Sequence, residues 1–316
     1  SSAGLLFDKN KTELIKYPAG KSLKNFNIPN GVKSLDGYSF CNCSNLTSIN
    51  IPESVTYIGI GAFYLCTNLK SIAIPDSVTK IENITFTGCS SLTSISIPES
   101  VTYIGLDAFK DCTSLTSIYI PDSVTLTGLS GTFSGCTSLT NVKLPDVIYI
   151  ISTNTFAGCS SLLNIIIPDS VTSIKECAFE GCKSLTNIAI PESVTKIKTW
   201  AFKDCTSLKS IAINNPDCEI SNAKDTIPET AVIYGYKNST AQTYAESFNR
   251  KFISLEEIGD ISGNGEIDLY DAIEIAKAIM GLRTFTAEEM IIADFNMDGT
   301  VDLYDAIEIA RTLLPK

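Results

Sequence analysis

Residues 63–81 read FYLCTNLKSIAIPDSVTKI, and close variants of this stretch fill most of the chain. Each variant carries an Ile-Pro dipeptide or a near equivalent, and its prolines are spaced 23 residues apart, with one step of 24. A fixed period of about 20–29 residues predicts a solenoid, in which each repeat forms one turn of a coil. The prolines of the series are Pro29, Pro52, Pro75, Pro98, Pro121, Pro145, Pro168 and Pro191.

Within one repeat, Ile72 and Ile74 alternate with period two, which predicts a half-buried strand that Pro75 ends. Val78 and Ile81 predict a second short strand on another side of the coil. Equivalent residues of successive turns then stack at the strand spacing of about 4.8 Å. We therefore expect a β-rich solenoid in which ladders of Phe, Cys, Leu and Ile form one continuous core.

Eight of the eleven cysteines occupy one position of the repeat. Stacking brings their Cα atoms to about 5 Å, within disulfide range, but their parallel Cβ vectors do not converge on a bond. A disulfide or metal ladder is one interpretation, and we favour free, buried, structural thiols. The state of Cys41, Cys177 and Cys218, which lie outside the ladder, is left open. The ladder residues are Cys43, Cys66, Cys89, Cys112, Cys136, Cys159, Cys182 and Cys205.

Variable positions of the repeat are expected to face solvent. Tyr57, Tyr103 and Tyr119 lie at such positions and form either a binding face or scattered surface residues. Residues 126–132 carry the extra residue and residues 146–151 abandon the S-V-T pattern, which favours a bulge or bend over a ligand-specific feature. Acidic residues after the prolines are typical of a solvated turn: Glu53, Asp76, Glu99, Asp122, Asp169 and Glu192.

The composition argues against several functions. The chain of 316 residues contains no histidine, which removes the commonest general base and zinc ligand, and it has no GxSxG, GxxxxGK[ST] or GxGxxG motif. We therefore expect no enzymatic activity. Residues 256–316 hold 14 acidic and four basic residues, which disfavours nucleic acid as a partner. No apolar run approaches the roughly 18 residues that cross a bilayer, so we expect a soluble protein without membrane insertion.

Two copies of one loop pattern, 34 residues apart, begin at Asp260 and Asp294. Oxygen-bearing side chains stand at loop positions 1, 3, 5, 9 and 12, with glycine at position 6. A calcium ion takes several oxygen ligands at about 2.3–2.6 Å, and the glycine permits the sharp turn. Both loops have Asp at position 12, where an ordinary EF-hand has a bidentate Glu. Residues 268–276 and 302–310 both read DLYDAIEIA and predict a helix after each loop.

Both parts of the chain resemble known families. The repeat consensus over residues 28–213 resembles the BspA-like bacterial leucine-rich repeats. The paired loops and helices over residues 259–316 resemble a dockerin, a small all-α module of two F-hand-like loop-helix motifs. A generic EF-hand pair is the alternative, but the five residues before Asp260 are too few for an entering helix. Capping segments are expected at residues 1–27 (a hairpin) and 214–258 (strand, helix, strand).

The resemblance to dockerins implies two bound calcium ions and a set of ligands. Loop one offers three side-chain carboxylates and loop two offers four, so we predict tighter binding at loop two. The implied ligands are the side chains of Asp260, Ser262, Asn264, Asp268 and Asp271 with the Glu266 carbonyl, and those of Asp294, Asn296, Asp298, Asp302 and Asp305 with the Thr300 carbonyl.

The resemblance also implies a partner, the cohesin module of a scaffoldin. Its contact residues would be Leu269, Tyr270, Ile273 and Lys277, repeated as Leu303, Tyr304, Ile307 and Arg311. The best-known dockerins often carry small hydroxyl residues where this chain has Leu-Tyr, which suggests a more apolar contact. Because the two faces are nearly identical, we predict two alternative binding orientations.

We therefore expect a secreted, non-catalytic protein on a cellulosome or cell surface, whose solenoid binds a protein or glycan ligand. An accessory or catalytic component acting on plant polysaccharide is the alternative, since most dockerins tether such enzymes. The continuous repeat, which leaves no room for a catalytic domain, weighs against that alternative. A third interpretation, a structural spacer, predicts no ligand.

Overall fold

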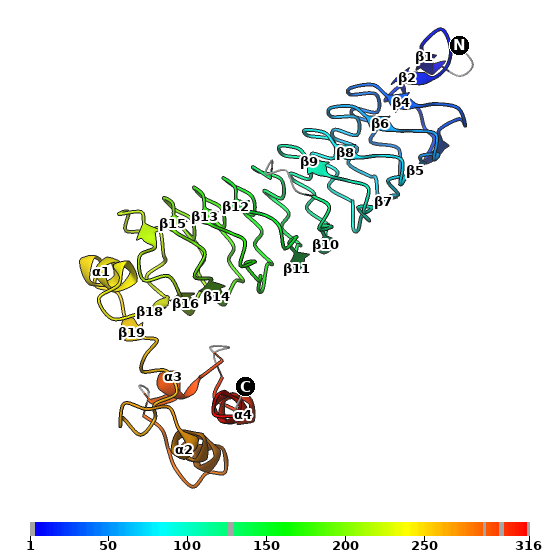
Figure 1. Cartoon of the computed structure of the whole chain (residues 1–316). Helices are drawn as coiled ribbons and strands as arrows, with labels where there is room; N and C mark the ends of the chain where they lie inside the picture. Colours follow the sequence, from blue (N-terminus) through cyan, green and yellow to red (C-terminus); the bar gives the residue numbers. More distant parts are fainter. Residues whose placement is uncertain (1–3, 125–128, 287–288, 297–299, 315–316) are drawn as a thin grey trace.

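The computed structural model describes residues 4–124, 129–286, 289–296 and 300–314. The repeats form an elongated solenoid whose short parallel strands line two sides of the coil, and a small helical domain lies beyond its last turn (Figure 1). One row contains β3 (Asn25–Asn27), β5 (Ser48–Asn50), β7 (Ser71–Ile72), β10 (Ser117–Tyr119), β11 (Asn141–Lys143), β14 (Asn187–Ile190) and β16 (Ser210–Ile213). The other contains β4 (Ser34–Leu35), β6 (Tyr57–Ile58), β8 (Lys80–Ile81), β9 (Tyr103–Ile104), β12 (Ile150–Ile151), β13 (Ser173–Ile174), β15 (Lys196–Ile197) and β17 (Glu219–Ile220).

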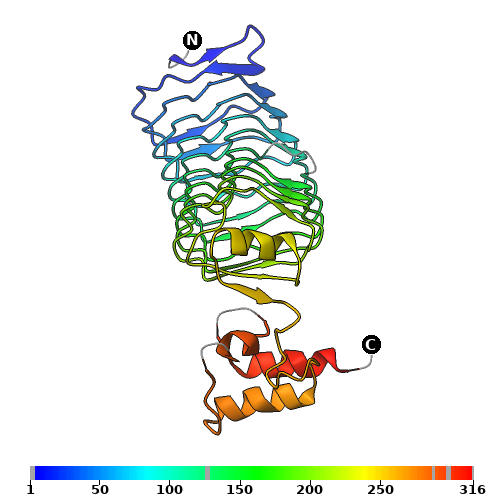
Figure 2. The same ribbon diagram turned by 90° about the vertical axis from the view of Figure 1, so that its left-hand side faces the viewer.

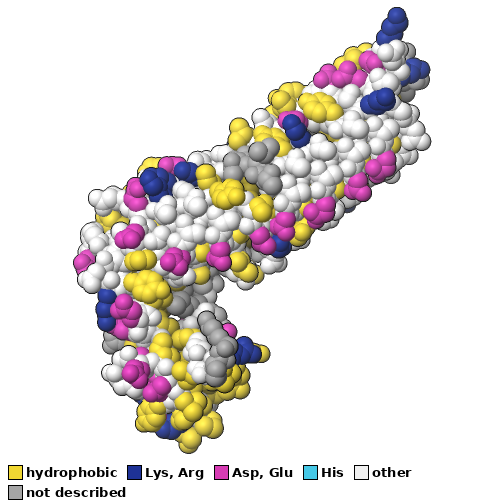
Figure 3. All heavy atoms as spheres, viewed as in Figure 1, with side chains coloured by type: hydrophobic (Ala, Val, Ile, Leu, Met, Phe, Trp, Pro, Cys, Tyr) yellow, Lys and Arg dark blue, Asp and Glu magenta, His cyan; other side chains and the backbone are white. Residues whose placement is uncertain are grey.

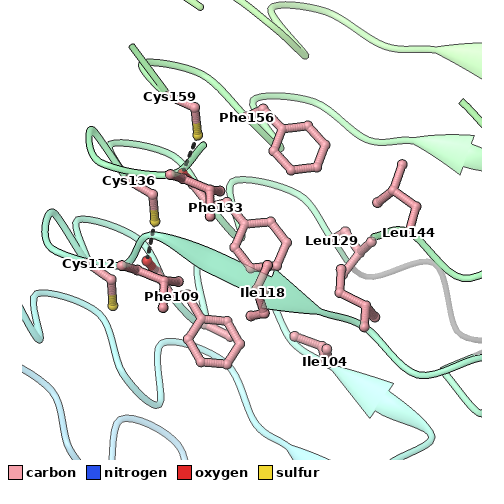
Figure 4. Packing of buried hydrophobic residues seen from close by; sticks show 14 of the residues in the cluster. Ile104, Phe109, Cys112, Ile118, Leu129, Phe133, Cys136, Leu144, Phe156 and Cys159 are labelled. Atoms are coloured by element: carbon pink, nitrogen blue, oxygen red, sulfur yellow. Dashed lines mark hydrogen bonds between the residues drawn. The ribbon is translucent and has the colours of Figure 1, made fainter. Parts of the chain in front are cut away.

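A phenylalanine ladder runs through the core. The rings from Phe40 to Phe202 are fully buried and stack with centroids 5.3–5.7 Å apart (Figure 4). The longest spacing, 5.7 Å, joins Phe109 to Phe133, across the step with the extra residue. Part of that step, residues 125–128, lies outside the described residues. Ile148 keeps the place that valine holds in other repeats and is buried, so the core continues past the irregular sequence.

Both ends of the solenoid carry additional elements. At the start, β1 (Leu6–Phe7) pairs antiparallel with β2 (Glu13–Lys16), and β2 continues in parallel with β4. At the end, β18 (Val232–Gly235) and β19 (Phe252–Ser254) extend the row of β14 and β16, and α1 (Thr240–Ser247) lies across the last turn (Figure 2). Ser239 caps α1 by accepting from the N–H of Gln242, whereas the Gln242 side chain accepts from Asn238 and not from Ser239.

The helical domain contains α2 (Leu269–Ile279), α3 (Glu289–Ala293) and α4 (Leu303–Thr312). The long helices α2 and α4 pack side by side (Figure 2), and each buries the equivalent stripe of its repeated sequence. Among the described residues, no helix is long and apolar enough to cross a membrane. The domain core consists of Ile261, Ala272, Ile275, Ala293, Ala306 and Ile309.

Each of the eight repeats from Tyr38 to Asp204 contains two positions with left-handed backbone. Gly131 and Gly135 occupy them in one repeat, where a positive φ carries no steric cost. In other repeats, bulky residues adopt the same conformation, including Ile84 at φ 50° and Trp200 at φ 60°. The stacking of neighbouring turns therefore imposes a conformation that these side chains disfavour.

Candidate calcium loops and partner-binding helices

Loop one winds around the carboxylate of Asp260. Its Oδ1 atom accepts from the Ser262 hydroxyl at 3.2 Å and from the N–H of Asn264 at 3.1 Å. Its Oδ2 atom accepts from the N–H of Gly265 at 2.7 Å. Asn264 in turn accepts from the N–H of Glu266 at 2.7 Å. The predicted ligands at positions 1, 3 and 5 therefore lie on one tight turn, with Glu266 following at position 7.

Asp271, at position 12, is completely buried and closes the loop. Its two oxygens accept from the N–H groups of Ser262 and Asp268, each at 2.9 Å. Asp268 accepts from the N–H of Tyr270 at 2.7 Å, so the two carboxylates form a capping box at the start of α2. The short side chain of Asp at position 12 therefore ties the first helical turn back to the loop.

Loop two repeats this arrangement. Asp305 is completely buried and accepts from the N–H groups of Asn296 at 3.1 Å and Asp302 at 2.8 Å. Asp302 accepts from the N–H of Tyr304 at 2.7 Å and caps α4. Asp294 is buried and Thr300 is exposed. The predicted ligand Asp298 lies outside the described residues.

The residues present fit a hard divalent cation. Loop one supplies only oxygen donors, from carboxylates, a hydroxyl, an amide and a main-chain carbonyl, which is the donor chemistry of calcium. Asp271 is buried, yet no Lys or Arg of the described chain forms an ion pair with it. Within the described residues, no group of three Asp, Glu, Cys or His side chains is placed to hold a metal ion by itself.

The predicted partner contacts lie on the exposed sides of α2 and α4. Leu269 and Tyr270 are 59% and 55% exposed, and their counterparts Leu303 and Tyr304 are 57% and 68% exposed. Ile273 and Ile307 continue the stripe one turn later. Figure 3 shows apolar side chains gathered on this end of the molecule. The structure therefore brings each predicted set together on its own helix, and brings the two helices together.

The two basic residues of these stripes have different surroundings. The Lys277 ammonium donates to Glu274 at 2.7 Å and lies 5.6 Å from the centre of the Tyr270 ring. Hydrogen bonding to Glu274 raises the pKa of Lys277. Among the described residues, Arg311 has no ion pair, so its charge is available to a partner. Lys277 and Arg311 therefore hold equivalent positions in the sequence but have different ion-pair partners in the structure.

Sequence reasoning missed three residues of this domain. Met280 and Leu314 occupy equivalent positions, are 64% and 65% exposed, and extend the two apolar stripes by one turn beyond Lys277 and Arg311. The helical spacing from Ile273 was the signal that predicts them. Arg283 links α2 to α3 through Glu274 and Glu289, a contact for which the sequence gives no repeat signal.

The comparisons with known families match both parts. Residues 17–130 and 127–224 match the BspA type leucine rich repeat region, with six copies, and residues 258–314 match the dockerin type I domain. The repeat match spans more than half of the chain, which therefore belongs to the BspA-type leucine-rich repeat family. Its C-terminal domain is a dockerin type I domain, a class that binds calcium and cohesins.

Solved structures of bacterial leucine-rich repeat proteins are similar to this chain. A protein from Bacteroides ovatus is 29% identical over 77% of this chain and 73% of its own, with a TM-score of 0.59. One from T. pallidum is 27% identical over 65% of this chain and 86% of its own, with a TM-score of 0.49. One from Eubacterium ventriosum is 32% identical over 56% and 48%, with a TM-score of 0.47. No match was found among curated proteins.

Proposed function

We propose that this protein is a secreted, non-catalytic binding protein that attaches to a cellulosomal scaffold through its dockerin and presents its solenoid to a ligand. The observation that carries the proposal is the pair of exposed Leu-Tyr faces at the starts of α2 and α4. Exposed aromatic and aliphatic side chains grouped on one rigid face are typical of a protein-binding hot spot.

Two calcium ions, one in each loop, would hold these faces in place. The Asp at position 12 of each loop is also the third residue of the following helix, so the cation and the helix share one carboxylate. Calcium bound there stabilises the first turn that carries Leu269 and Tyr270 or their counterparts. Calcium thus fixes the conformation of the loops and helices, and the cohesin binds the resulting surface.

The attachment is tested by measuring binding of the full chain to a panel of cohesin modules, with calcium and with a chelator. We expect one class of cohesin to bind in calcium and to be released by the chelator. Tyr149→Ala, which removes an exposed tyrosine from the middle of the solenoid, is the matched control and should not change binding. Absence of binding to every cohesin in calcium would overturn the attachment.

The ligand of the solenoid is proposed to be a protein or glycan bound on the row of β3, β5 and β7. A shallow groove of about 520 Å³ lies there, lined by residues of four successive turns. None of its lining residues is charged, so it offers hydroxyl and amide groups for hydrogen bonds. They are Asn27, Ser48, Ile49, Asn50, Ser71, Ile72, Ala73, Ser94, Ile95 and Ser96.

Acidic side chains spaced along one edge of the solenoid run beside these strands (Figure 3). Some of them have partners from the neighbouring turn, because Asp122 pairs with Lys143 at 3.8 Å and Glu99 accepts from Tyr119 at 3.5 Å. Tyr57 and Tyr119 are exposed whereas Tyr103 is half-buried. Of these tyrosines, we assign Tyr119 to the same surface as the groove, because it is exposed and lies on β10, which belongs to the same row of strands.

Glycan and protein arrays probed with the labelled full chain test this second part. A ligand whose binding is lost in Ser71→Arg and retained in Tyr149→Ala would support the groove. An activity screen on plant polysaccharides runs alongside, and turnover of any polysaccharide would contradict the non-catalytic assignment. Failure of every array would favour a structural spacer.

A further inference from the structure

The two halves of the dockerin differ in what surrounds loop position 2. Ile261 holds that position in loop one and is buried within the core of the dockerin itself. Phe295 holds it in loop two and packs both against that core and against a second apolar cluster. We call this second group the junction cluster: Ala212, Tyr234, Ile253 and Ile258, with Val232, Leu255 and Phe295 at its edge.

The junction cluster is built on the last sheet of the solenoid. Ala212 of β16 pairs with Tyr234 of β18, and Tyr234 pairs with Ile253 of β19, so the three side chains form one row. Their neighbours Ile211 and Ile233 point to the opposite face and belong to the solenoid core. All three residues of the row are at most 7% exposed. The outer side chains of β16, β18 and β19 are therefore buried where the dockerin lies next to these strands (Figures 1 and 2), and Phe295 packs on them.

The segment that joins the two parts is bonded on both sides. The N–H of Leu255 donates to the carbonyl of Gly235 in the solenoid cap at 2.8 Å. The N–H of Gly259 donates to the carbonyl of Ile292 in the dockerin, also at 2.8 Å. A Cβ atom at Gly259 would lie 2.7 Å from the ring of Phe295, so only glycine permits this approach. Residues 255–259 therefore hold the dockerin against the solenoid.

Phe295 lies between two of the expected calcium ligands, Asp294 and Asn296. Asn296 lines a small hollow of about 220 Å³ together with Asn187 and Ser210 of the sheet. Asp294 is buried and lies near Tyr234 of β18. In loop two, Phe295 thus packs on the last sheet of the solenoid, Asp294 is buried and Asn296 borders the hollow, whereas loop one exposes Ser262 and Asn264 to solvent.

We propose that the last sheet of the solenoid positions the second calcium loop, so that packing of Phe295 on the junction cluster and calcium binding to loop two stabilise each other. The proposal rests on calcium binding by the dockerin, as proposed above. Coupling between two events is reciprocal, so opening the junction weakens calcium binding by the same factor by which calcium loss loosens the junction. Ala212 and Tyr234 are then positioning residues for the second calcium loop.

The test opens the junction from the solenoid side. Ala212→Gln places a larger neutral side chain on the outer face of β16, under the dockerin. Ile166→Gln is the matched control, because Ile166 holds the equivalent repeat position and is 87% exposed. Calcium binding to the full chain is measured by calorimetry in two backgrounds. Asp260→Asn weakens calcium binding at loop one, so the affinity measured in that background is that of loop two. Asp294→Asn weakens loop two, so the affinity measured is that of loop one.

We expect Ala212→Gln to weaken loop two about tenfold, a typical coupling, and to leave loop one unchanged. Ile166→Gln should change calcium binding at neither loop. Tyr234→Ala should reproduce the effect and Tyr234→Phe should restore most of the affinity, which keeps the test decisive if Ala212→Gln fails to fold. Equal calcium affinities in all these variants, or equal losses of affinity at both loops, would overturn the coupling between the junction and loop two but not the calcium assignment. No calcium binding by the unsubstituted chain would overturn the calcium assignment as well.

Discussion

The thiols of the ladder cysteines are buried and form hydrogen bonds between neighbouring turns. From Cys66 to Cys205, each thiol donates to the carbonyl of the phenylalanine in the preceding turn, at 3.0–3.3 Å (Figure 4). Each of these carbonyls also accepts from the backbone N–H of the cysteine in its own turn. The ladder cysteine therefore fills a small apolar space and adds a second hydrogen bond to a buried carbonyl, which alanine does not. All eleven cysteines lie in the described part of the chain and are free thiols.

These environments predict an order of thiol reactivity. Burial raises the pKa of Cys89 and Cys136 to about 12, so the reactive thiolate is scarce at neutral pH. In a native chain treated with an aromatic disulfide reagent at pH 8, half-exposed Cys41 should react first. Cys177 should react slowly and faster toward pH 11, because burial, and then Glu180, raise its pKa to about 11. Rapid native-state labelling of any ladder cysteine would contradict this order, and unfolding should expose all eleven.

The left-handed position of Ile84 predicts a stabilising substitution. A β-branched residue at φ 50° is strained, whereas asparagine tolerates this conformation and keeps a Cβ atom. We expect Ile84→Asn to increase the free energy of unfolding by about 1 kcal/mol. Denaturant unfolding measures the change, with Asn154→Ile, at the equivalent position of another repeat, as the reverse control. Destabilisation by Ile84→Asn would show that the contacts of the half-buried isoleucine outweigh its backbone strain.

At the scale of elements, the repeated helices predict two binding orientations for the dockerin. Changing Leu269 and Tyr270 of α2 to alanine should leave cohesin affinity within a few-fold of the original, because α4 presents the same pair after a half-turn of the domain. The same change in α4 should have a similar effect, and changing both pairs should abolish binding. Surface plasmon resonance compares the unsubstituted chain, the two single-helix variants and the double variant. Loss of binding in one single-helix variant would refute the dual mode.

The loops predict an order of calcium affinity. Loop two has one more carboxylate than loop one, and ligand charge raises affinity. We expect loop two to fill first in a calcium titration followed by NMR of the loop glycine amides, with Gly265 reporting on loop one and Gly299 on loop two. A titration in which Gly265 responds first would contradict the prediction.

The elements that repeat were predictable from sequence, and those that break the repeat were not. Period alone placed Phe63, Cys66 and Ile72 in ladders, because identical turns can bury such residues only by stacking. The left-handed backbone at Ile84 and Trp200 gave no signal, since these repeats lack the glycine that marks it elsewhere. Phe295 also escaped notice, because its counterpart Ile261 is equally apolar and only the three-dimensional arrangement separates their roles.

At the scale of the whole molecule, the two cores predict separable unfolding. The solenoid core and the dockerin core are distinct clusters of buried residues, and the junction cluster is a third, smaller one. In calorimetry, a chelator should lower the dockerin transition strongly, since calcium at 1,000 times its dissociation constant contributes about 4 kcal/mol. The solenoid transition should shift by only a few degrees. Magnesium in place of calcium is the control, and a single transition insensitive to chelator would contradict the expectation.

The regular spacing of the phenylalanine ladder has a consequence for how the protein can change in length. Each turn advances the stack by 5.3–5.7 Å, and each end is closed by elements that contact only the terminal turns. Duplication or deletion of a gene segment encoding one whole repeat would therefore add or remove one rung and leave both ends intact. The distance of the far tip from the dockerin would then change in equal steps, without the need for a new fold.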